Sequence, residues 1–325
     1  MDLFLQFEEV LEIIMKRKIN LVGNNTLTVS LPSQWAKERG LKKGDEVDIC
    51  LGDSSLILSL EGKKPTEKEI TLDISNFSKH MLARHLEVLY MTGYGKITLT
   101  YNVQEILADK EKKKVNVKNL IKHLSNRFIG MEIVSQGKNM TELRCFLLNE
   151  EKNLEKIEKR IFFLLKDTFD EFLDCLDGRH HEFQPNVQDY HENVSKFTTY
   201  YLRVLDQSDT SEHEKKQLHT LHLIIDKLMD KFRHINGMIH RYGCTERVRK
   251  HLKDIFELVY EQFSALHNRE IKKELVSKRY DLVRQVEGAD YTLEELRVMG
   301  EAKIFLDTIN DFSRAVIVKK ILSNK

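Results

Sequence analysis

Residues 165–174 read LKDTFDEFLD, and residues 252–261 read LKDIFELVYE. The two stretches share Leu-Lys-Asp, a Phe two residues later, and acidic residues at matching positions. Each is followed by a second shared pattern, D-xxx-D-xx-R, at residues 226–233 in the first copy and 307–314 in the second. Two patterns that recur in the same order at similar offsets indicate a duplicated helical unit. Because residues four apart share one face of a helix, each copy carries carboxylates along one side.

Residues 150–325 are predicted to be helical nearly throughout, as two repeats of three helices that span about residues 150–243 and 244–325. Apolar residues at steps of four and three predict core-facing stripes in the third and the last helix. The first stripe is Leu221, Ile225, Leu228, Phe232, Ile235 and Ile239, and the second is Phe305, Ile309, Phe312 and Val316. At about 100° per residue the acidic pairs point away from these stripes. We therefore expect the carboxylates to lie outside the core.

The repeated carboxylates are candidate metal ligands. They are Asp170, Asp174, Asp226, Asp230, Glu257, Glu261, Asp307 and Asp311. Two neighbouring helices of a repeat would bring four of them onto one surface, where hard oxygen ligands suit Mg, Ca, Mn or iron. Like charges crowd at a cost unless a cation is present. The alternative is an acidic solvated face with weak ion pairs from Asp230 to Arg233 and from Asp311 to Arg314. Three loop histidines, His180, His181 and His191, are possible further ligands.

Composition limits the remaining possibilities. A chain of 325 residues with 41% apolar and 32% charged residues exceeds the usual size of a single core, so we expect two or three domains. Lys and Arg total 52 against 51 Asp and Glu, and no overall field draws the chain to nucleic acid or an anionic membrane. The four cysteines form no C-x-x-C pair, which favours a reduced cytoplasmic protein. The longest apolar runs are far shorter than the roughly 20 residues of a membrane span.

The first 15 residues read MDLFLQFEEVLEIIM. Their apolar positions fit a short amphipathic helix or N-terminal extension, and their acidic residues exclude a secretory signal. An alternative is that translation begins at Met15.

Residues 16–61 are predicted to form a unit of the order ββαββ. The stretch 17–49 reads RKINLVGNNTLTVSLPSQWAKERGLKKGDEVDI. Alternating apolar and polar residues flank Gly23-Asn24-Asn25, which indicates a hairpin. A short helix follows, with Ser33 as its expected cap and Gly40 at its end. So short a unit buries too little surface to be stable alone, and a partner copy is implied.

This stretch resembles the AbrB/SpoVT family of DNA-binding domains, over roughly residues 16–60. The resemblance implies a swapped-hairpin β-barrel built by two chains, and therefore a homodimer that binds DNA. Residues 16–44 contain seven basic residues and one acidic residue, and cations gathered on one face neutralise phosphates. The candidate DNA contacts are Arg17, Lys18, Lys37 and Arg39. The alternative is a domain that only dimerises, because this chain has Asn24, Asn25, Gln34 and Trp35 where DNA-binding relatives usually carry arginines.

After a charged linker, EGKKPTEK at residues 61–68, residues 68–149 are predicted to form a small α+β sandwich of the order βαβαββ. The expected helices lie at about residues 79–92 and 117–128, and residues 109–114 form a charged run, DKEKKK. No Gly-rich phosphate loop or nucleophile constellation appears. Arg84, Tyr90, Gly93 and Tyr94 are possible ligand contacts, and the alternative is a surface arginine with packed tyrosines.

The duplicated helical half resembles the PhoU family of phosphate-signalling proteins over about residues 150–325. The resemblance implies metal ions on the surface carboxylates, with Asp226, Asp230, Asp307 and Asp311 at the motif positions. Together the three domains are similar to fused archaeal regulators of phosphate uptake.

We therefore expect a dimeric transcription regulator with a sensory or docking half. The alternative is a PhoU-like protein that docks on a phosphate transporter or signalling protein and only dimerises through its first domain. No enzyme activity is expected, because the carboxylates face outward instead of into a bundle core.

Overall fold

A computed structural model describes residues 16–23, 25–51, 56–59, 68–109, 112–147, 153–208, 210–268 and 273–323. The chain divides into two compact units, Met1–Thr66 and Glu67–Lys325. Each is considered by itself. The expected N-terminal helix and most of the expected linker lie outside the described residues.

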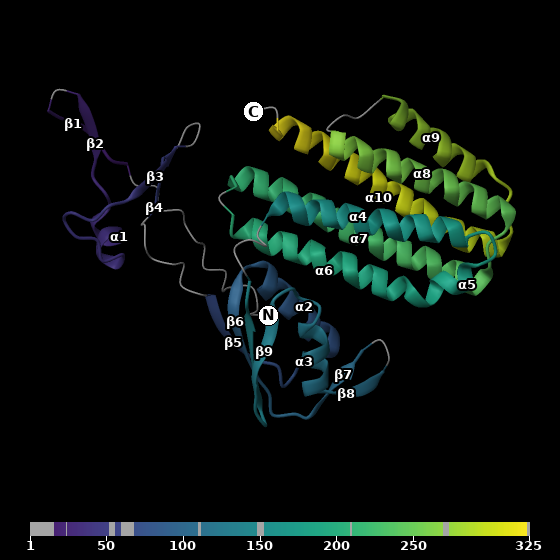
Figure 1. The fold of residues 1–325 in the computed structure, drawn as a ribbon, viewed down its shortest axis with the longest axis horizontal. Helices are drawn as coiled ribbons and strands as arrows, with labels where there is room; N and C mark the ends of the chain where they lie inside the picture. The colour runs from purple at the N-terminus through teal and green to yellow at the C-terminus, as the bar shows by residue number, and fades with distance from the viewer. Residues whose placement is uncertain are drawn as a thin grey trace, which may run out of the picture. The chain divides into compact units, whose positions relative to one another are not determined.

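The first unit has the predicted ββαββ order (Figure 1). It comprises β1 (Ile19–Val22), β2 (Thr26–Val29), α1 (Ser33–Glu38), β3 (Asp48–Leu51) and β4 (Leu56–Ser59). Gly23 turns the first hairpin with a positive φ of 66°, which glycine adopts without strain. Ser33 does not cap α1 as expected: Pro32 occupies the N-cap position and Ser33 is the first helical residue. Proline suits a helix start because it has no N–H to leave unpaired.

The β1–β2 hairpin exposes one apolar face. Antiparallel pairing sets Ile19 opposite Val29 and Leu21 opposite Leu27, so these four side chains lie on the same side of the hairpin. Their exposed fractions are 69%, 51%, 64% and 68% in that order. In the described part of this unit, β1–β2 and β3–β4 are separate two-stranded sheets and no barrel closes. Within the described residues of this unit, the face is therefore uncovered.

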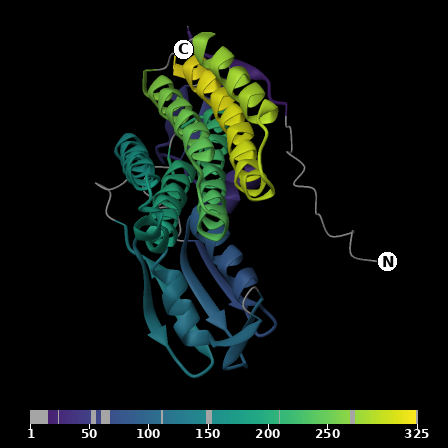
Figure 2. The same cartoon turned by 90° about the vertical axis from the view of Figure 1, so that its right-hand side faces the viewer.

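The second unit begins with an α+β part (Figure 2). Its sheet has the order β5-β6-β10-β9, and β5 (Lys68–Asp73) runs parallel to β6 (Tyr94–Thr100) while the other pairs are antiparallel. The sheet is completed by β9 (Met131–Gln136) and β10 (Met140–Cys145), and α2 (Lys79–Met91) and α3 (Val117–Ser125) pack with it. Each helix starts at a polar N-cap, since Ser78 and Asn116 accept hydrogen bonds from backbone N–H groups.

One element of this part was not predicted. Residues 105–116, expected to contain only a charged run after the second strand, form a hairpin of β7 (Glu105–Ala108) and β8 (Lys113–Asn116). Ile106 and Ala108 alternate with exposed residues and are buried. The last strand, β10, spans Met140–Cys145. The βαβαββ order therefore holds with an inserted hairpin.

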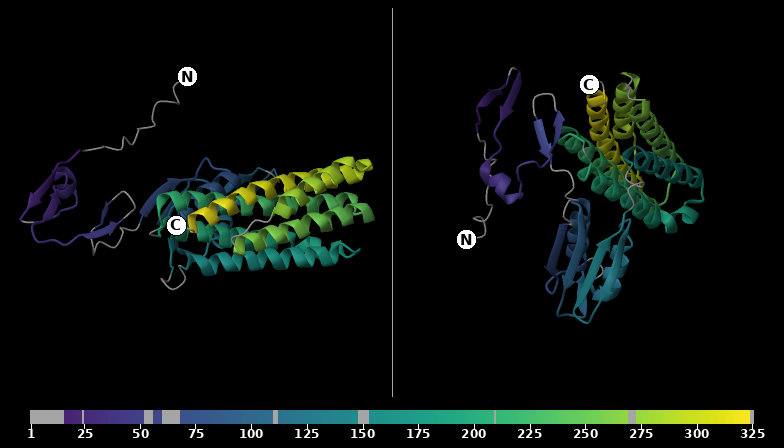
Figure 3. Two further views of the ribbon diagram at one scale, coloured as in Figure 1. Left: turned by 90° about the horizontal axis from the view of Figure 1, so that it is seen from above. Right: turned by 60° about the vertical axis from the view of Figure 1, so that its left-hand side comes forward.

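The rest of the second unit is a bundle of long helices that run side by side (Figure 3). The first repeat contains α4 (Leu154–Cys175), α6 (Val187–Asp206) and α7 (Glu212–Tyr242), with the short α5 (His180–Phe183) and η2 (Gln184–Asn186) between α4 and α6. The second contains α8 (Glu246–Asn268), α9 (Lys273–Gly288) and α10 (Leu293–Ser323). Gly243 ends α7 with a φ of +83° and separates the repeats. The predicted helical half is confirmed.

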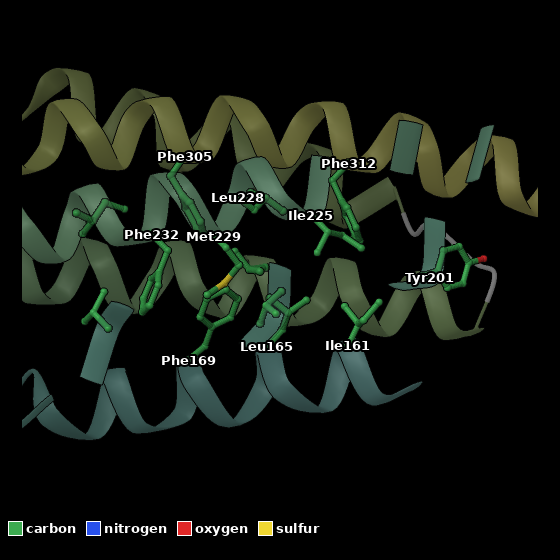
Figure 4. Packing of buried hydrophobic residues seen from close by; sticks show 14 of the residues in the cluster. Ile161, Leu165, Phe169, Tyr201, Ile225, Leu228, Met229, Phe232, Phe305 and Phe312 are labelled. Atoms are coloured by element: carbon green, nitrogen blue, oxygen red, sulfur yellow. The ribbon is translucent and has the colours of Figure 1, made fainter. Parts of the chain in front are cut away.

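The two repeats share one core, shown from close by in Figure 4. The predicted stripe on α7 is buried, with every member at most 3% exposed. The ring of Phe169 lies 5.1 Å from that of Phe232 and 5.1 Å from that of Phe256. Phe169 and Phe256 occupy the same position in the two copies of the LKDxF motif. The aromatic residue of the duplicated motif thus holds one repeat against the other.

A buried arginine joins the bundle to the α+β part. Arg203 of α6 is 3% exposed, and its Nη1 donates to the carbonyl oxygens of Tyr90 at 2.6 Å and Tyr94 at 2.9 Å. Its guanidinium carbon lies 4.8 Å from the ring centroid of Tyr90. Carbonyls at the end of α2 have no partner within the helix, and a cation is favourable there. This contact holds α2 against α6, beside a cavity that residues of both helices line.

Candidate functional site

The candidate DNA contacts lie at the edges of the first unit's elements. Arg17 and Lys18 directly precede β1, Lys37 is in the last turn of α1, and Arg39 follows that helix at its C-cap. All four are exposed. Exposed basic side chains of this kind are typical contacts of DNA phosphate groups.

The structure brings Asp226 and Asp230 of α7 together with α6 of the same repeat. Ser195 Oγ donates to Asp226 Oδ1 at 2.5 Å. His191 Nε2 and Arg233 Nη2 lie 3.0 and 2.9 Å from Asp230 Oδ1. The hydrogen bond from His191 holds the pKa of Asp230 well below its usual range, with help from Arg233 and against partial burial. The predicted ion pair between Asp230 and Arg233 is confirmed.

The acids of the second repeat have different partners. Arg279 of α9 pairs with Asp307 at 3.0 Å. Lys278, also on α9, lies 2.7 Å from Glu261 and 3.8 Å from Glu257. The side chain of Arg314, expected to pair with Asp311, lies outside the described residues. In this repeat a lysine and an arginine of the middle helix, α9, form ion pairs with Glu257, Glu261 and Asp307.

Asp170 and Asp174 of α4 do not join the acids of α7. Asp170 accepts from Lys166 at 2.5 Å and from the Tyr260 hydroxyl of α8 at 2.7 Å. The bond from Lys166 is the main cause of a lowered pKa for Asp170. Asp174 is exposed. The sequence correctly predicts that these carboxylates lie outside the core, since none of the eight is buried, but it does not predict which side chains they contact.

Metal binding by these residues stays a prediction. Across the described residues no group of three or more His, Cys, Asp or Glu side chains is arranged to hold a metal ion. Most of the candidates instead face a lysine, an arginine or a hydroxyl group. In this arrangement an incoming cation would have to displace those partners.

The three histidines also have individual places. His180 Nε2 lies 2.9 Å from Asn236 Oδ1, and burial lowers the pKa of His180. His181 lies 4.0 Å from Glu182. Only His191 approaches one of the candidate carboxylates among the described contacts of the three.

Asp226 and Asp230 line a cavity of about 240 Å³ between the bundle and the α+β part. The wall on the α+β side comes from α2 and the residues after α3, and the other wall from α6 and α7. Its charged lining residues are Arg84, Glu87, Arg127, Lys196, Asp226, Asp230 and Arg233, with His80 and His191. Arg84, a possible ligand contact from the sequence, is among them. Tyr90, another such candidate, is instead packed in the core.

Several residues of this region were missed. Arg127 and Lys196 come from distant segments and carry no motif. Arg203 had a usable signal, because a single arginine in the apolar run YYLRVL at residues 200–205 is rarely buried without a specific partner.

Within the described part of the chain, no helix has both the length and the apolar character needed to cross a membrane.

Comparison with known families supports the first unit's expected fold. The family described as "Antidote-toxin recognition MazE, bacterial antitoxin" matches residues 21–70, which contain β2, α1, β3 and β4. Neither the comparison with curated proteins nor the comparison with solved structures gave a match. The match supports an AbrB-like domain near the start of the chain, at residues 21–70.

Proposed function

We propose that this protein is a homodimeric regulator that binds DNA through its first unit and senses or docks through its helical half. The observation that carries the proposal is the exposed apolar face of the β1–β2 hairpin, beside a cluster of exposed basic residues. The match to the MazE-type family over residues 21–70 supports it.

A second copy of the chain is the expected cover for the hairpin. Two-stranded sheets are marginal in water unless they pack on another apolar surface. Burying the side chains of Ile19, Leu21, Leu27 and Val29 stabilises the pair by about 1.5–3 kcal/mol for each residue fully covered. An identical face on a second copy meets this need with twofold symmetry. Dimerisation also doubles the number of cations available to DNA.

The proposed mode of DNA binding is electrostatic. Arg17, Lys18, Lys37 and Arg39 neutralise phosphates and release counterions, which gives affinity for any sequence and a steep dependence on salt. Base readout would have to come from other side chains of the same face.

The finer part of the proposal is control of phosphate uptake. It is supported by the resemblance of the duplicated helical half to PhoU-type proteins and by the recurrence of D-xxx-D in α7 and α10. A second candidate is a docking regulator of a phosphate transporter, in which the first unit only dimerises. Asn25 and Gln34, at positions where DNA-binding relatives usually carry arginines, favour this candidate.

The first prediction separates the two candidates. Changing Arg17 and Lys18 to Ala is expected to weaken binding to all DNA sequences and to reduce the log–log salt slope by about one unit per lost phosphate contact. Gel shifts at several salt concentrations measure both quantities. The matched control changes Lys42 and Lys43, which are also exposed, and is expected to alter the slope less. If the intact dimer shows no salt-dependent binding to duplex DNA, the DNA-binding role is wrong and the docking role stands.

A further inference from the structure

The cavity between α2 and α6 contains more unpaired hydrogen-bond donors than unpaired acceptors. Its volume of about 240 Å³ is just below the roughly 300 Å³ at which pockets for drug-sized ligands begin, so it suits a small solute. Polar and charged side chains dominate its lining. The chemistry of the ligand follows from which of these groups are already paired.

The acceptors of the lining are engaged. Asp226 accepts from Ser195, and Asp230 accepts from both His191 and Arg233. Glu87 accepts from Arg84 Nη1 at 3.3 Å. Each carboxylate of the cavity thus already has a donor from the protein.

Donors of the lining are left over. The side chain of the half-buried Arg127 donates no hydrogen bond to any described residue. Burial raises the pKa of nearby Glu87, and the charge of Arg127 opposes this effect. Arg233 Nε is buried without a partner. Lys196 bonds only a neutral group, the carbonyl oxygen of Asn126 at 3.0 Å, and forms no ion pair within the described chain.

The buried His191 also lines the cavity and leaves its Nδ1 without a hydrogen-bond partner. Because its Nε2 donates to Asp230, Nδ1 of the neutral ring is an acceptor and adds no donor. Leaving buried polar groups and cations unpaired costs free energy. A ligand with acceptor oxygens and a negative charge would pair with Arg127, Lys196 and Arg233 Nε and remove this cost. A metal cation would instead be repelled by the positive charges of Arg127 and Lys196.

We propose that this cavity binds a small oxyanion through Arg127, Lys196 and the free Nε edge of Arg233. Guanidinium groups bind phosphate, sulfate and carboxylate oxygens with charge-assisted hydrogen bonds, often in pairs. Arg127 belongs to the α+β part, while Lys196 and Arg233 belong to the bundle. The bound anion therefore bridges the two parts beside the Arg203 contact and stabilises their packing.

This site distinguishes the two repeats. Asp307 and Asp311 are the counterparts of Asp226 and Asp230 but do not line the cavity, whose bundle residues all come from α6 and α7 of the first repeat. One ligand per chain is therefore expected despite the duplication. The site does not depend on DNA binding, so either proposal can fail without the other.

Isothermal titration of the full-length protein with inorganic phosphate, sulfate and succinate, each alone, tests the proposal. At least one of these oxyanions is expected to bind with one site per chain and to raise the melting temperature. Arg127→Gln is expected to weaken that binding at least about tenfold, the value of one charge-assisted hydrogen bond. Lys122→Gln, an exposed position on α3 outside the cavity, is the matched control and is expected to leave it unchanged.

If circular dichroism shows that Arg127→Gln is poorly folded, two further variants test the same proposal. Lys196→Gln is expected to weaken binding, with Lys227→Gln on the exposed side of α7 as its control. Glu87→Gln is expected to strengthen binding, because it removes a negative charge from the wall and frees Arg84. No heat from any of the three oxyanions at millimolar concentration would overturn the proposal, as would equal weakening by the cavity variants and their controls.

Discussion

The two units treat their apolar side chains in opposite ways. On α7, apolar residues at helical spacing are at most 3% exposed because α4, α6 and α10 cover them. On β1 and β2, apolar residues at strand spacing are more than half exposed. The periodicity of each segment is equally regular, so the difference lies in what is available to cover it. The bundle covers its own apolar stripe, whereas the described part of the first unit leaves its apolar face exposed.

The largest expected effect comes from placing charge on the hairpin's apolar face. In the proposed dimer, Leu21→Asp combined with Leu27→Asp buries two carboxylates from each chain and removes four leucine side chains, each worth about 1.5–3 kcal/mol. We expect dissociation into single chains and loss of DNA binding, measured by sedimentation and gel shift.

The matched control lies on the other face of the same hairpin. Asn20 and Thr28 pair across the strands and are exposed, so Asn20→Asp with Thr28→Asp adds the same charge without touching the apolar face. If both double variants keep the wild-type mass, or both dissociate, the apolar face is not the interface.

A substitution in the bundle core tests whether one chain alone stabilises the buried stripe. Phe169 is fully buried among Phe232 and Phe256, and Phe169→Ala is expected to cost about 3–5 kcal/mol in the free energy of unfolding. Phe163 on the same helix is 54% exposed, so Phe163→Ala is expected to cost less than about 1 kcal/mol. Urea denaturation followed by helical circular dichroism measures both. Similar costs at the two positions would refute the shared core.

The smallest expected effect concerns acid stability. The pKa of Asp230 is lower in the folded protein than in the unfolded chain, so its contribution is fully present above the unfolded pKa near 3.9 and disappears as pH falls toward the folded value. Because the side chain is 42% exposed, we expect only about 1 kcal/mol.

Urea denaturation at neutral pH and at the acid end of the folded range measures this contribution. Asp230→Asn is expected to lower stability at neutral pH and to flatten the acid dependence. The control, Asp167→Asn, is at an exposed position with no hydrogen bond or ion pair to a described residue, and it is expected to change neither. An unaltered pH profile for Asp230→Asn would show that the His191 contact contributes nothing.

Local patterns predicted the elements well where one face is buried. The stripe from Leu221 to Ile239 and the alternation in residues 19–29 each place apolar side chains on one face, and the structure contains the helix and hairpin they predict. The stripe on the helix is buried, whereas the apolar face of the hairpin is exposed. The β7–β8 hairpin was missed because lysines fill β8 and hide its alternation. Its residues pair with β7 through the backbone, which leaves little trace in side-chain type.

The contacts of the candidate site could not be predicted in the same way. Spacing correctly placed Asp226 and Asp230 outside the core, but it cannot indicate that α6 presents Ser195 and His191 to them. Arg127 and Arg233 are over a hundred positions apart in the sequence and reach one cavity only because α2 docks on α6. Tertiary packing decides these pairings, and a single sequence carries no local signal of it.

The central claim is that the apolar face of the first hairpin is covered by a second copy of the chain. Sedimentation equilibrium of the intact protein over a wide range of concentrations tests it most directly. We predict a mass twice the 38.3 kDa of one chain, retained on dilution into the nanomolar range. A uniform mass of 38.3 kDa at every concentration, with the first unit folded, would contradict the claim.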